Sequence, residues 1–225
     1  MASKKYQKIK QAAPAQAVDV QAAAAFIKKH ARQSFDETIE LHIRLNINPQ
    51  KSELAVRGSV VLPAGAISIQ RIVVITDEIS LQEAATAAGA ARTGGEDIIA
   101  EIIESGTLDA DSVIATPAMM PRLTKAARIL GPKGLMPNPK TGTVTDDPGQ
   151  AVAELMDGKI SFKMDQLGNI HLAIAKTSWA AEKIVANAEA ALAAVRQAKP
   201  AAAKGEYIRS ITLSSTMGPG IRVAA

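Results

Sequence analysis

The stretch Gly131-Pro-Lys-Gly-Leu-Met-Pro-Asn-Pro-Lys-Thr-Gly142, here called the signature loop, decides how the rest of the chain is interpreted. Its prolines fix their own φ angles, remove backbone donors and push the preceding residues out of the helical region. Its glycines permit backbone angles that side chains forbid. This composition predicts a stiff loop that begins where a predicted helix, Met119–Leu130, ends.

Composition alone leaves two functions open for the signature loop, a rigid connector and a phosphate cradle. A Walker loop reads Gly-x-x-x-x-Gly-Lys-Ser/Thr, and Lys140-Thr141 supplies its last pair. However, Pro139 stands where the second glycine must be, and proline has no N–H to donate to a phosphate. No Gly-x-Gly-x-x-Gly follows the apolar run Ile72–Ile75 either, so the nucleotide-binding alternative fails on its chemistry.

The run Ile129–Val144 resembles the signature of the L-one family, the first protein of the large ribosomal subunit. Three further matches lie far from it: Ser34-Phe-Asp-Glu-Thr38, Val56-Arg-Gly-Ser-Val-Val-Leu-Pro63 and Ser215-Thr-Met-Gly-Pro219. The resemblance therefore covers nearly the whole chain. There is one departure: many family members carry a Gly-Thr-Gly-Lys-like run after the Leu-Pro pair, whereas Ala64–Ile69 has one glycine and no lysine. The resemblance therefore implies neither hinge freedom nor a phosphate contact at that run.

The composition sets broad limits on the function. A chain of 225 residues can form one or two domains, and the absence of cysteine excludes disulfides and thiolate metal sites. The net charge of +4 mildly favours a polyanionic partner, while only 3% aromatic residues argue against a reader of stacked single-stranded bases. No apolar run resembles a signal peptide or a membrane span, so we expect a cytoplasmic protein with no membrane partner. The basic start (Lys4, Lys5, Lys8, Lys10) is interpreted as a solvated tail, with an RNA-touching arm as the alternative.

The two ends of the chain share one pattern, in which strands alternate apolar and polar residues. Such strands have one buried face. Asp19 is placed to cap a helix over Val20–Arg32, and Ser178 is placed to cap one that runs to about Lys199. The predicted strands are Thr38–Ile47, Leu54–Leu62, Lys159–Met164, Asn169–Ala175 and Tyr207–Ser214.

The middle of the chain has a different pattern. Ile72–Ile75 and Val113–Ala115 are continuous apolar runs, typical of strands covered on both faces. Predicted helices alternate with them, which favours βαβ units and a parallel sheet. These helices are Ser80–Ala88, Glu96–Ser105, Met119–Leu130 and Pro148–Met156.

We therefore predict two domains of the α/β and α+β classes. Residues 1–65 plus 158–225 form a discontinuous, RNA-binding α+β domain, and residues 66–157 form an inserted α/β domain. The resemblance implies a ferredoxin-like split α+β fold for the first and a Rossmann-like fold for the second. Gly65 and Gly158 suit the two crossings between them.

No catalytic set is visible, and no metal site or cofactor is expected. Two features fit RNA instead, and the first is a polar sheet face on the terminal domain whose amide, hydroxyl and cationic groups can meet phosphates and 2′-hydroxyls. The alternative is an ordinary solvated strand face. This predicted face consists of Arg44, Arg57, Ser59, Lys163, Asn169, His171, Thr212, Ser214 and Thr216.

The resemblance places the main ribosomal RNA contact on this same domain, near the Ser-Phe-Asp-Glu-Thr and Thr-Met-Gly-Pro motifs. Phe35 and Met217 belong to those motifs, although as apolar residues they could equally lie in a core. The RNA-binding residues that we add from these motifs and the ends of the neighbouring strands are Phe35, Thr38, Lys176, Ser178, Met217 and Gly218.

The second feature is a basic stripe on Met119–Leu130, formed by Arg122, Lys125 and Arg128. Lys133 and Lys140 of the signature loop extend this charge. Such a stripe is usually a solvated helix face. Placed beside the signature loop, it could also face ribosomal or transfer RNA.

The resemblance implies a non-enzymatic protein of the large ribosomal subunit that binds 23S ribosomal RNA. It further implies a mobile stalk beside the exit site for tRNA, help in releasing deacylated tRNA, and repression of translation of its own operon mRNA, with the protein a monomer within the ribosome. The alternatives are a phosphate-handling α/β enzyme, against which Pro139 argues, and a free RNA chaperone.

Overall fold

The computed structural model describes residues 4–31, 34–47, 56–68, 70–201, 203 and 205–224. The chain separates into two compact units, Met1–Ile67 with Ile160–Ala225 and Ser68–Lys159, here called the terminal unit and the insert. The domain boundaries predicted from the sequence, 65/66 and 157/158, fall slightly earlier. Both units combine helices with strands, so the chain has the mixed α/β composition that the sequence predicts.

The terminal unit is built on a four-stranded antiparallel sheet with the order β7-β1-β8-β9. Its central strand β1 (Thr38–Leu45) pairs with β7 (Asn169–Lys176) on one side and with β8 (Ile208–Ser215) on the other. The short β9 (Ile221–Val223), which the sequence did not predict, completes the sheet beside β8. Along β1 the apolar side chains are buried and the alternate polar ones reach solvent, as the sequence pattern predicts.

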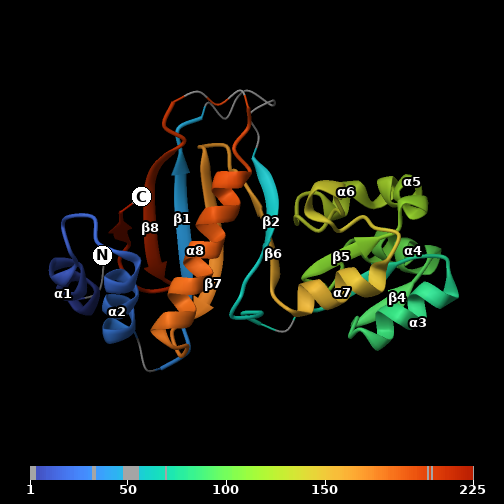
Figure 1. Cartoon of the computed structure of the whole chain (residues 1–225). Helices are drawn as coiled ribbons and strands as arrows, with labels where there is room; N and C mark the ends of the chain where they lie inside the picture. Colours follow the sequence, from blue (N-terminus) through green and yellow to red (C-terminus); the bar gives the residue numbers. More distant parts are fainter. Residues whose placement is uncertain are drawn as a thin grey trace. The chain divides into compact units, whose positions relative to one another are not determined.

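Two helices cover the apolar face of this sheet, and Figure 1 shows them beside each other. They are α2 (Val20–His30) and α8 (Ala181–Gln197). The Asp19 carboxylate accepts a hydrogen bond from the backbone N–H of Val20, which confirms its predicted role as N-cap. The core between helices and sheet is made by Ala23, Ala24, Ile27, Ile39, Leu41, Ile43, Ile184, Ala188, Ala191 and Val195.

A second, two-stranded sheet joins β2 (Arg57–Val61) to β6 (Lys159–Lys163). Gly58 lets the strands approach the Phe162 ring, because a Cβ at Gly58 would lie 2.8 Å from a ring carbon. The start of the predicted strand at Leu54 lies outside the described residues.

The insert contains a parallel three-stranded sheet with the order β4-β3-β5, formed by Arg92–Gly94, Ile72–Ile75 and Ser112–Ala115 respectively. Helices α3 (Ile79–Ala87) and α7 (Pro148–Met156) pack on one face, and α4 (Glu96–Ser105) packs on the other. The predicted bounds of α4 and α7 are confirmed, whereas β4 was not predicted. The likeness of the two units to ferredoxin-like and Rossmann-like folds stays a prediction.

The predicted helix Met119–Leu130 is wrong as a single helix. It is a series of short turns: η2 (Pro117–Met119), α5 (Met120–Leu123), η3 (Thr124–Ala126) and α6 (Ala127–Leu130). Pro121 removes a backbone donor from the first turns, and the Thr124 hydroxyl donates to the carbonyl of Met120.

Two other sequence predictions are corrected at the helix starts. Lys4–Ala12 forms a helix, α1, rather than the predicted solvated tail. Helix α8 begins at Ala181, and Ser178 does not cap it, because both the backbone N–H and the hydroxyl of Ser178 donate to Asp36. None of the helices that the structure describes is both long and apolar enough to cross a bilayer.

Candidate nucleic-acid interface

Three segments far apart in the sequence meet at one end of the terminal sheet. Strand β1 begins at Thr38, and its antiparallel neighbours β7 and β8 end at Lys176 and Ser215, which pair with Thr38 and Ile39. The residues that precede β1 therefore lie against those that follow β7 and β8. We call this group the loop cluster; it consists of Phe35, Asp36, Thr38, Lys176, Thr177, Ser178, Thr216, Met217 and Gly218.

Thr38 connects two of the segments to β1. Its backbone N–H donates to the Thr216 hydroxyl at 3.0 Å, and its carbonyl accepts from the backbone N–H of Thr216 at 3.0 Å. The Lys176 ammonium donates to the Thr38 hydroxyl at 2.8 Å. These contacts hold the turn after β8 and the end of β7 in fixed positions beside the start of β1.

Asp36 fixes the third connection. Its carboxylate accepts from the Ser178 hydroxyl at 2.7 Å, from the Ser178 backbone N–H at 2.9 Å and from the Thr177 hydroxyl at 2.9 Å. The hydrogen bond from the Ser178 hydroxyl is the main cause that lowers the pKa of Asp36 below its ordinary value of 3.8. Sequence analysis missed Asp36 and Thr177, although Asp36 lies inside a quoted motif.

Two apolar side chains of the loop cluster point outward rather than into the core. Phe35 is 47% exposed and Met217 is 45% exposed, so the alternative that they are core residues is wrong. Beside Phe35 runs an open groove whose basic lining was not predicted as part of the site. The groove is lined by Lys28, Lys29, Ala31, Phe35, Asp36, Thr177 and Ser178.

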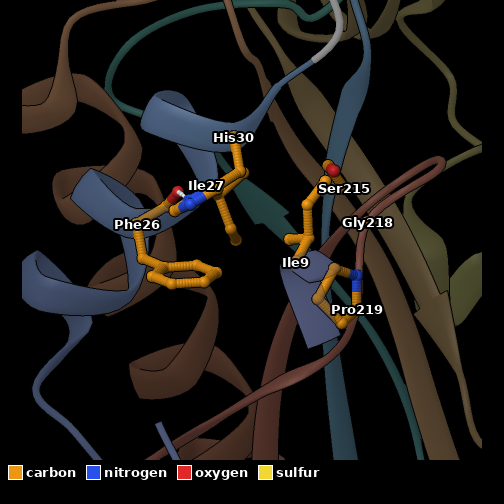
Figure 2. A pocket seen from close by; sticks show the side chains of 7 residues that line it. All are labelled: Ile9, Phe26, Ile27, His30, Ser215, Gly218 and Pro219. Carbon is orange, nitrogen blue, oxygen red and sulfur yellow. Dashed lines mark hydrogen bonds between the residues drawn. The ribbon is translucent and has the colours of Figure 1, made fainter. Parts of the chain in front are cut away.

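Figure 2 shows Gly218 and Pro219, in the turn after β8, at the edge of a small cavity. A Cβ on Gly218 would lie 2.5 Å from the Ser215 hydroxyl oxygen, so a larger residue would require that hydroxyl or the turn to move. Ile9 of α1 and Phe26 of α2 line the small cavity beside this turn. Both N-terminal helices therefore support the position of Gly218.

The polar face of the four-stranded sheet carries five of the predicted site residues. Register places Arg44 beside Asn169, and places His42 between His171 on β7 and Thr212 on β8. Ser214 follows on the same face of β8. The prediction of one continuous face is wrong for Arg57, Ser59 and Lys163, because β2 and β6 form a separate sheet. Alternation gave the correct face within each strand but could not reveal which strands pair.

His42 is a residue of this polar face that sequence reasoning did not select. Its Nδ1 lies 2.7 Å from Nδ1 of His171, and its Nε2 lies 2.9 Å from the Ser214 hydroxyl. Burial, followed by the charge of His171, lowers the pKa of His42 below its ordinary value of 6.5, while Glu40 acts in the opposite direction. Strict alternation along β1 already put His42 outward, so the missing information was its neighbour across the strands.

The basic residues of the insert are arranged differently. Arg122 forms ion pairs with Asp77 at 2.8 Å and Glu96 at 2.9 Å, so its charge is partly balanced within the insert. Lys125, Arg128 and Lys133 are exposed. Lys140 lies in the short turn η4 (Pro139–Thr141), and its side chain is outside the described part of the structure.

The signature loop is an ordered connector. The backbone N–H of Asn138 donates to the Thr143 hydroxyl oxygen at 2.8 Å, and the Thr141 hydroxyl donates to the Asn138 carbonyl at 2.9 Å. The carbonyl of Thr143 accepts from Ala115 at the end of β5, which ties the loop to the sheet. No group of three or more histidine, aspartate or glutamate residues within the described ranges is arranged to hold a metal ion.

Comparison with known proteins agrees with the motifs of the loop cluster. The sequence profile of the Ribosomal protein L1p/L10e family matches residues 27–219, which include Phe35 and Gly218. The chain belongs to this family. Its relatives include proteins named large ribosomal subunit protein uL1.

Three of these relatives cover most of the chain. The protein of Solibacter usitatus is 44% identical over 98% of this chain and 92% of its own length. That of Mycoplasma capricolum is 47% identical over 87% of this chain and 86% of its own length, and that of Cutibacterium acnes is 48% identical over 89% and 86%. The resemblance predicted from the signature loop is thereby confirmed as a bacterial-type member of the family.

Proposed function

We propose that this chain is a structural, non-enzymatic component of the large ribosomal subunit in the cytoplasm, where its terminal unit binds 23S ribosomal RNA. The observation that carries the proposal is the loop cluster, in which three segments expose Phe35, Ser178, and Thr216 with Met217 at one end of the sheet. Family membership supports ribosomal RNA as the partner. No cofactor or metal ion is part of the proposal.

The chemistry of the loop cluster suits folded RNA. The Lys176 ammonium keeps two hydrogens that can be donated to phosphates, and the Thr216 and Ser178 hydroxyl oxygens, whose hydrogens are donated to Thr38 and Asp36, can accept from 2′-hydroxyls. Exposed Phe35 and Met217 offer apolar surface to sugar edges. The groove beside Phe35 adds two lysines, Lys28 and Lys29. Because the Ser178 hydroxyl donates to Asp36, its oxygen is held as an acceptor before RNA arrives.

A titration of the intact chain with a 23S fragment at several salt concentrations tests this proposal. Each phosphate contact that is formed adds about 0.7–0.9 to the slope of log affinity against log salt. We expect a slope that corresponds to several phosphate contacts. Duplex DNA of equal charge should compete poorly with the 23S fragment for binding. A slope near zero, or equal competition by duplex DNA, would contradict specific binding of folded RNA.

We further propose that the insert serves a mobile stalk beside the tRNA exit site and aids release of deacylated tRNA. Exposed Lys125, Arg128 and Lys133 support this role, because such cations attract a phosphate backbone without reading sequence. In the ribosome the protein would act as a monomer. Ribosomes that carry alanine at all three positions should release deacylated tRNA more slowly, and an unchanged release rate would contradict this role.

Binding to its own operon mRNA, with repression of translation, follows if that mRNA presents the same RNA shape to the loop cluster. The two RNAs would then compete for one site. An rRNA fragment and the mRNA leader should displace each other in a binding assay, and Met217→Asp should weaken both. Simultaneous binding of the two RNAs would contradict a shared site.

A further inference from the structure

Two histidines on neighbouring strands share a hydrogen bond on the polar face of the terminal sheet. The Nδ1 atoms of His42 and His171 are 2.7 Å apart, so one carries hydrogen and the other offers a lone pair. At the far side of each ring lies another polar group. The Nε2 of His42 is 2.9 Å from the Ser214 hydroxyl, and the Nε2 of His171 is 3.5 Å from the Asp165 carboxylate.

One direction of hydrogen bonding satisfies the whole chain of groups with both rings neutral. Asp165 accepts, so the Nε2 of His171 carries its hydrogen and the Nδ1 of His171 has the lone pair. His42 then donates from Nδ1 to His171, and its own Nε2 accepts from the Ser214 hydroxyl. In this state the hydrogen of Ser214 points toward His42 and away from solvent.

A further proton therefore enters at Nε2 of His42. There the new N–H donates to the Ser214 oxygen and lies near the Glu40 carboxylate, which is 3.7 Å from Nε2. The Ser214 hydroxyl then turns its own hydrogen outward. The face gains one positive charge and one outward donor, and both favour a phosphate oxygen.

We propose that binding of RNA phosphate at this sheet face is coupled to uptake of a proton by His42. The inference rests on the proposed function and specifies how one part of the same surface meets RNA. In the free protein, burial keeps the pKa of His42 below 6.5, so the ring is neutral above that pH. A phosphate placed over the face raises that pKa, because a nearby negative charge stabilises the imidazolium form.

The charged neighbours of the pair come from β1, from the turn before β7 and from β9. On β1, Glu40 favours the proton and Arg44 opposes it; Asp165, before β7, favours it. On β9, Arg222 lies opposite Thr212 and opposes it. Strand β8 contributes the hydroxyls of Ser210, Thr212 and Ser214 to this face. The two carboxylates and the two guanidinium groups have opposite effects on the pKa of His42. An added phosphate contributes a further negative charge, which favours the protonated ring.

The test is a titration of the intact chain with a 23S fragment at about pH 6 and about pH 8, at constant ionic strength. We expect affinity to be about threefold to tenfold higher at the lower pH, because one linked proton changes affinity by at most about tenfold per pH unit. Calorimetry in two buffers with different ionisation enthalpies should show net proton uptake at the lower pH.

Single substitutions locate the proton. His42→Gln should remove the pH dependence and the proton uptake, while His30→Gln, at the remaining histidine of the chain, should keep both. His171→Gln keeps a side-chain oxygen that can accept from Nδ1 of His42 but removes the second titratable ring, so the pH dependence and the proton uptake should persist. Loss of both in a folded His171→Gln variant would place the proton on His171 and overturn the assignment to His42.

Each outcome decides the proposal. Affinity that is equal at both pH values in the native chain, or pH dependence that survives in a folded His42→Gln variant, would overturn the proton linkage and leave the proposed function intact. Failure of the native chain to bind the 23S fragment at either pH would overturn both.

Discussion

The terminal unit and the insert both present basic residues to solvent, but the basic residues of the two predicted RNA surfaces are held differently. In the loop cluster, Lys176 is bound to Thr38 and Ser178 is bound to Asp36. In the insert, Lys125, Arg128 and Lys133 extend from a series of short helical turns, and Arg122 is directed to acidic neighbours of its own unit. Lys176 is thus held by a neighbouring side chain, whereas Lys125, Arg128 and Lys133 are exposed on the surface of the insert.

This difference distinguishes specific recognition of an RNA from non-specific electrostatic attraction to it. Groups fixed before binding lose little conformational entropy when RNA arrives, so their hydrogen bonds contribute to specific affinity. Long, solvated lysine side chains contribute mainly through counterion release, which does not depend on sequence or shape. We therefore expect substitutions in the loop cluster to have much larger effects on 23S affinity than substitutions in the insert.

The largest effect is expected for Met217→Asp. The new carboxylate would face phosphates from a turn that is 45% exposed, and we expect a loss of about 2 kcal/mol, or about 30-fold in affinity. Filter binding with a 23S fragment measures it. Ile103→Asp, which places the same charge at an equally exposed position on α4 of the insert, is the control and should change affinity less than about twofold. Equal losses in both variants, or unfolding of Met217→Asp, would contradict the site.

A smaller effect is expected for Asp36→Asn. The amide keeps the size of the side chain but loses the charge and one acceptor, so Ser178 and Thr177 are oriented less firmly. We expect about 1 kcal/mol, or about fivefold, in affinity, measured against Asp19→Asn, in which the amide can still cap α2. An unchanged affinity would show that Asp36 does not orient the site.

Asp36 also predicts a direction for pH dependence. Its pKa is lower in the folded chain than the ordinary value of 3.8, so its stabilising contribution is complete above that value and is lost as the pH falls through the folded pKa. The free energy of unfolding of Asp36→Asn, measured by urea titration, should therefore fall less than that of the native chain as the pH decreases below 3.8.

Removal of the insert should have a still smaller effect. The structure places the unit boundaries at 67/68 and 159/160, so replacement of Ser68–Gly158 by a short Gly/Ser linker leaves β2 and β6 whole. Affinity for the 23S fragment should stay within about threefold of the intact chain, because the loop cluster remains. A loss beyond about a hundredfold, with circular dichroism still that of a folded protein, would place the main RNA site in the insert.

Much of this arrangement could be predicted from the sequence, because burial follows local patterns. Alternation in Thr38–Leu45 identified the buried and solvent faces of β1, and Asp19 and Pro148 marked helix starts. What local patterns cannot specify is which strands become neighbours. Arg57 and Arg44 lie on equally convincing polar strand faces, yet they belong to different sheets.

The candidate site shows the same limit at the level of single side chains. The motifs Ser34–Thr38 and Ser215–Pro219 were selected by resemblance, but Asp36 became important only when the structure placed Ser178 beside it. Ser178 itself is a plausible helix cap in the sequence, and it loses that role because a carboxylate more than a hundred residues away accepts both of its donors. Contacts between distant segments are what convert a motif into a site.

The smallest effect is expected for simultaneous alanine substitution of Lys125, Arg128 and Lys133. If these side chains face tRNA or solvent rather than the 23S site, the affinity for a 23S fragment should change by less than about twofold, and the salt slope should fall by less than the value of one contact, about 0.7–0.9. The matched comparison is alanine substitution of Lys28, Lys29 and Lys176, which removes the same charge from the terminal unit and should reduce the slope by more than one contact. Similar slopes for the two triple variants would mean that charge acts over the whole molecule, and the division between a recognising unit and an attracting unit would have to be abandoned.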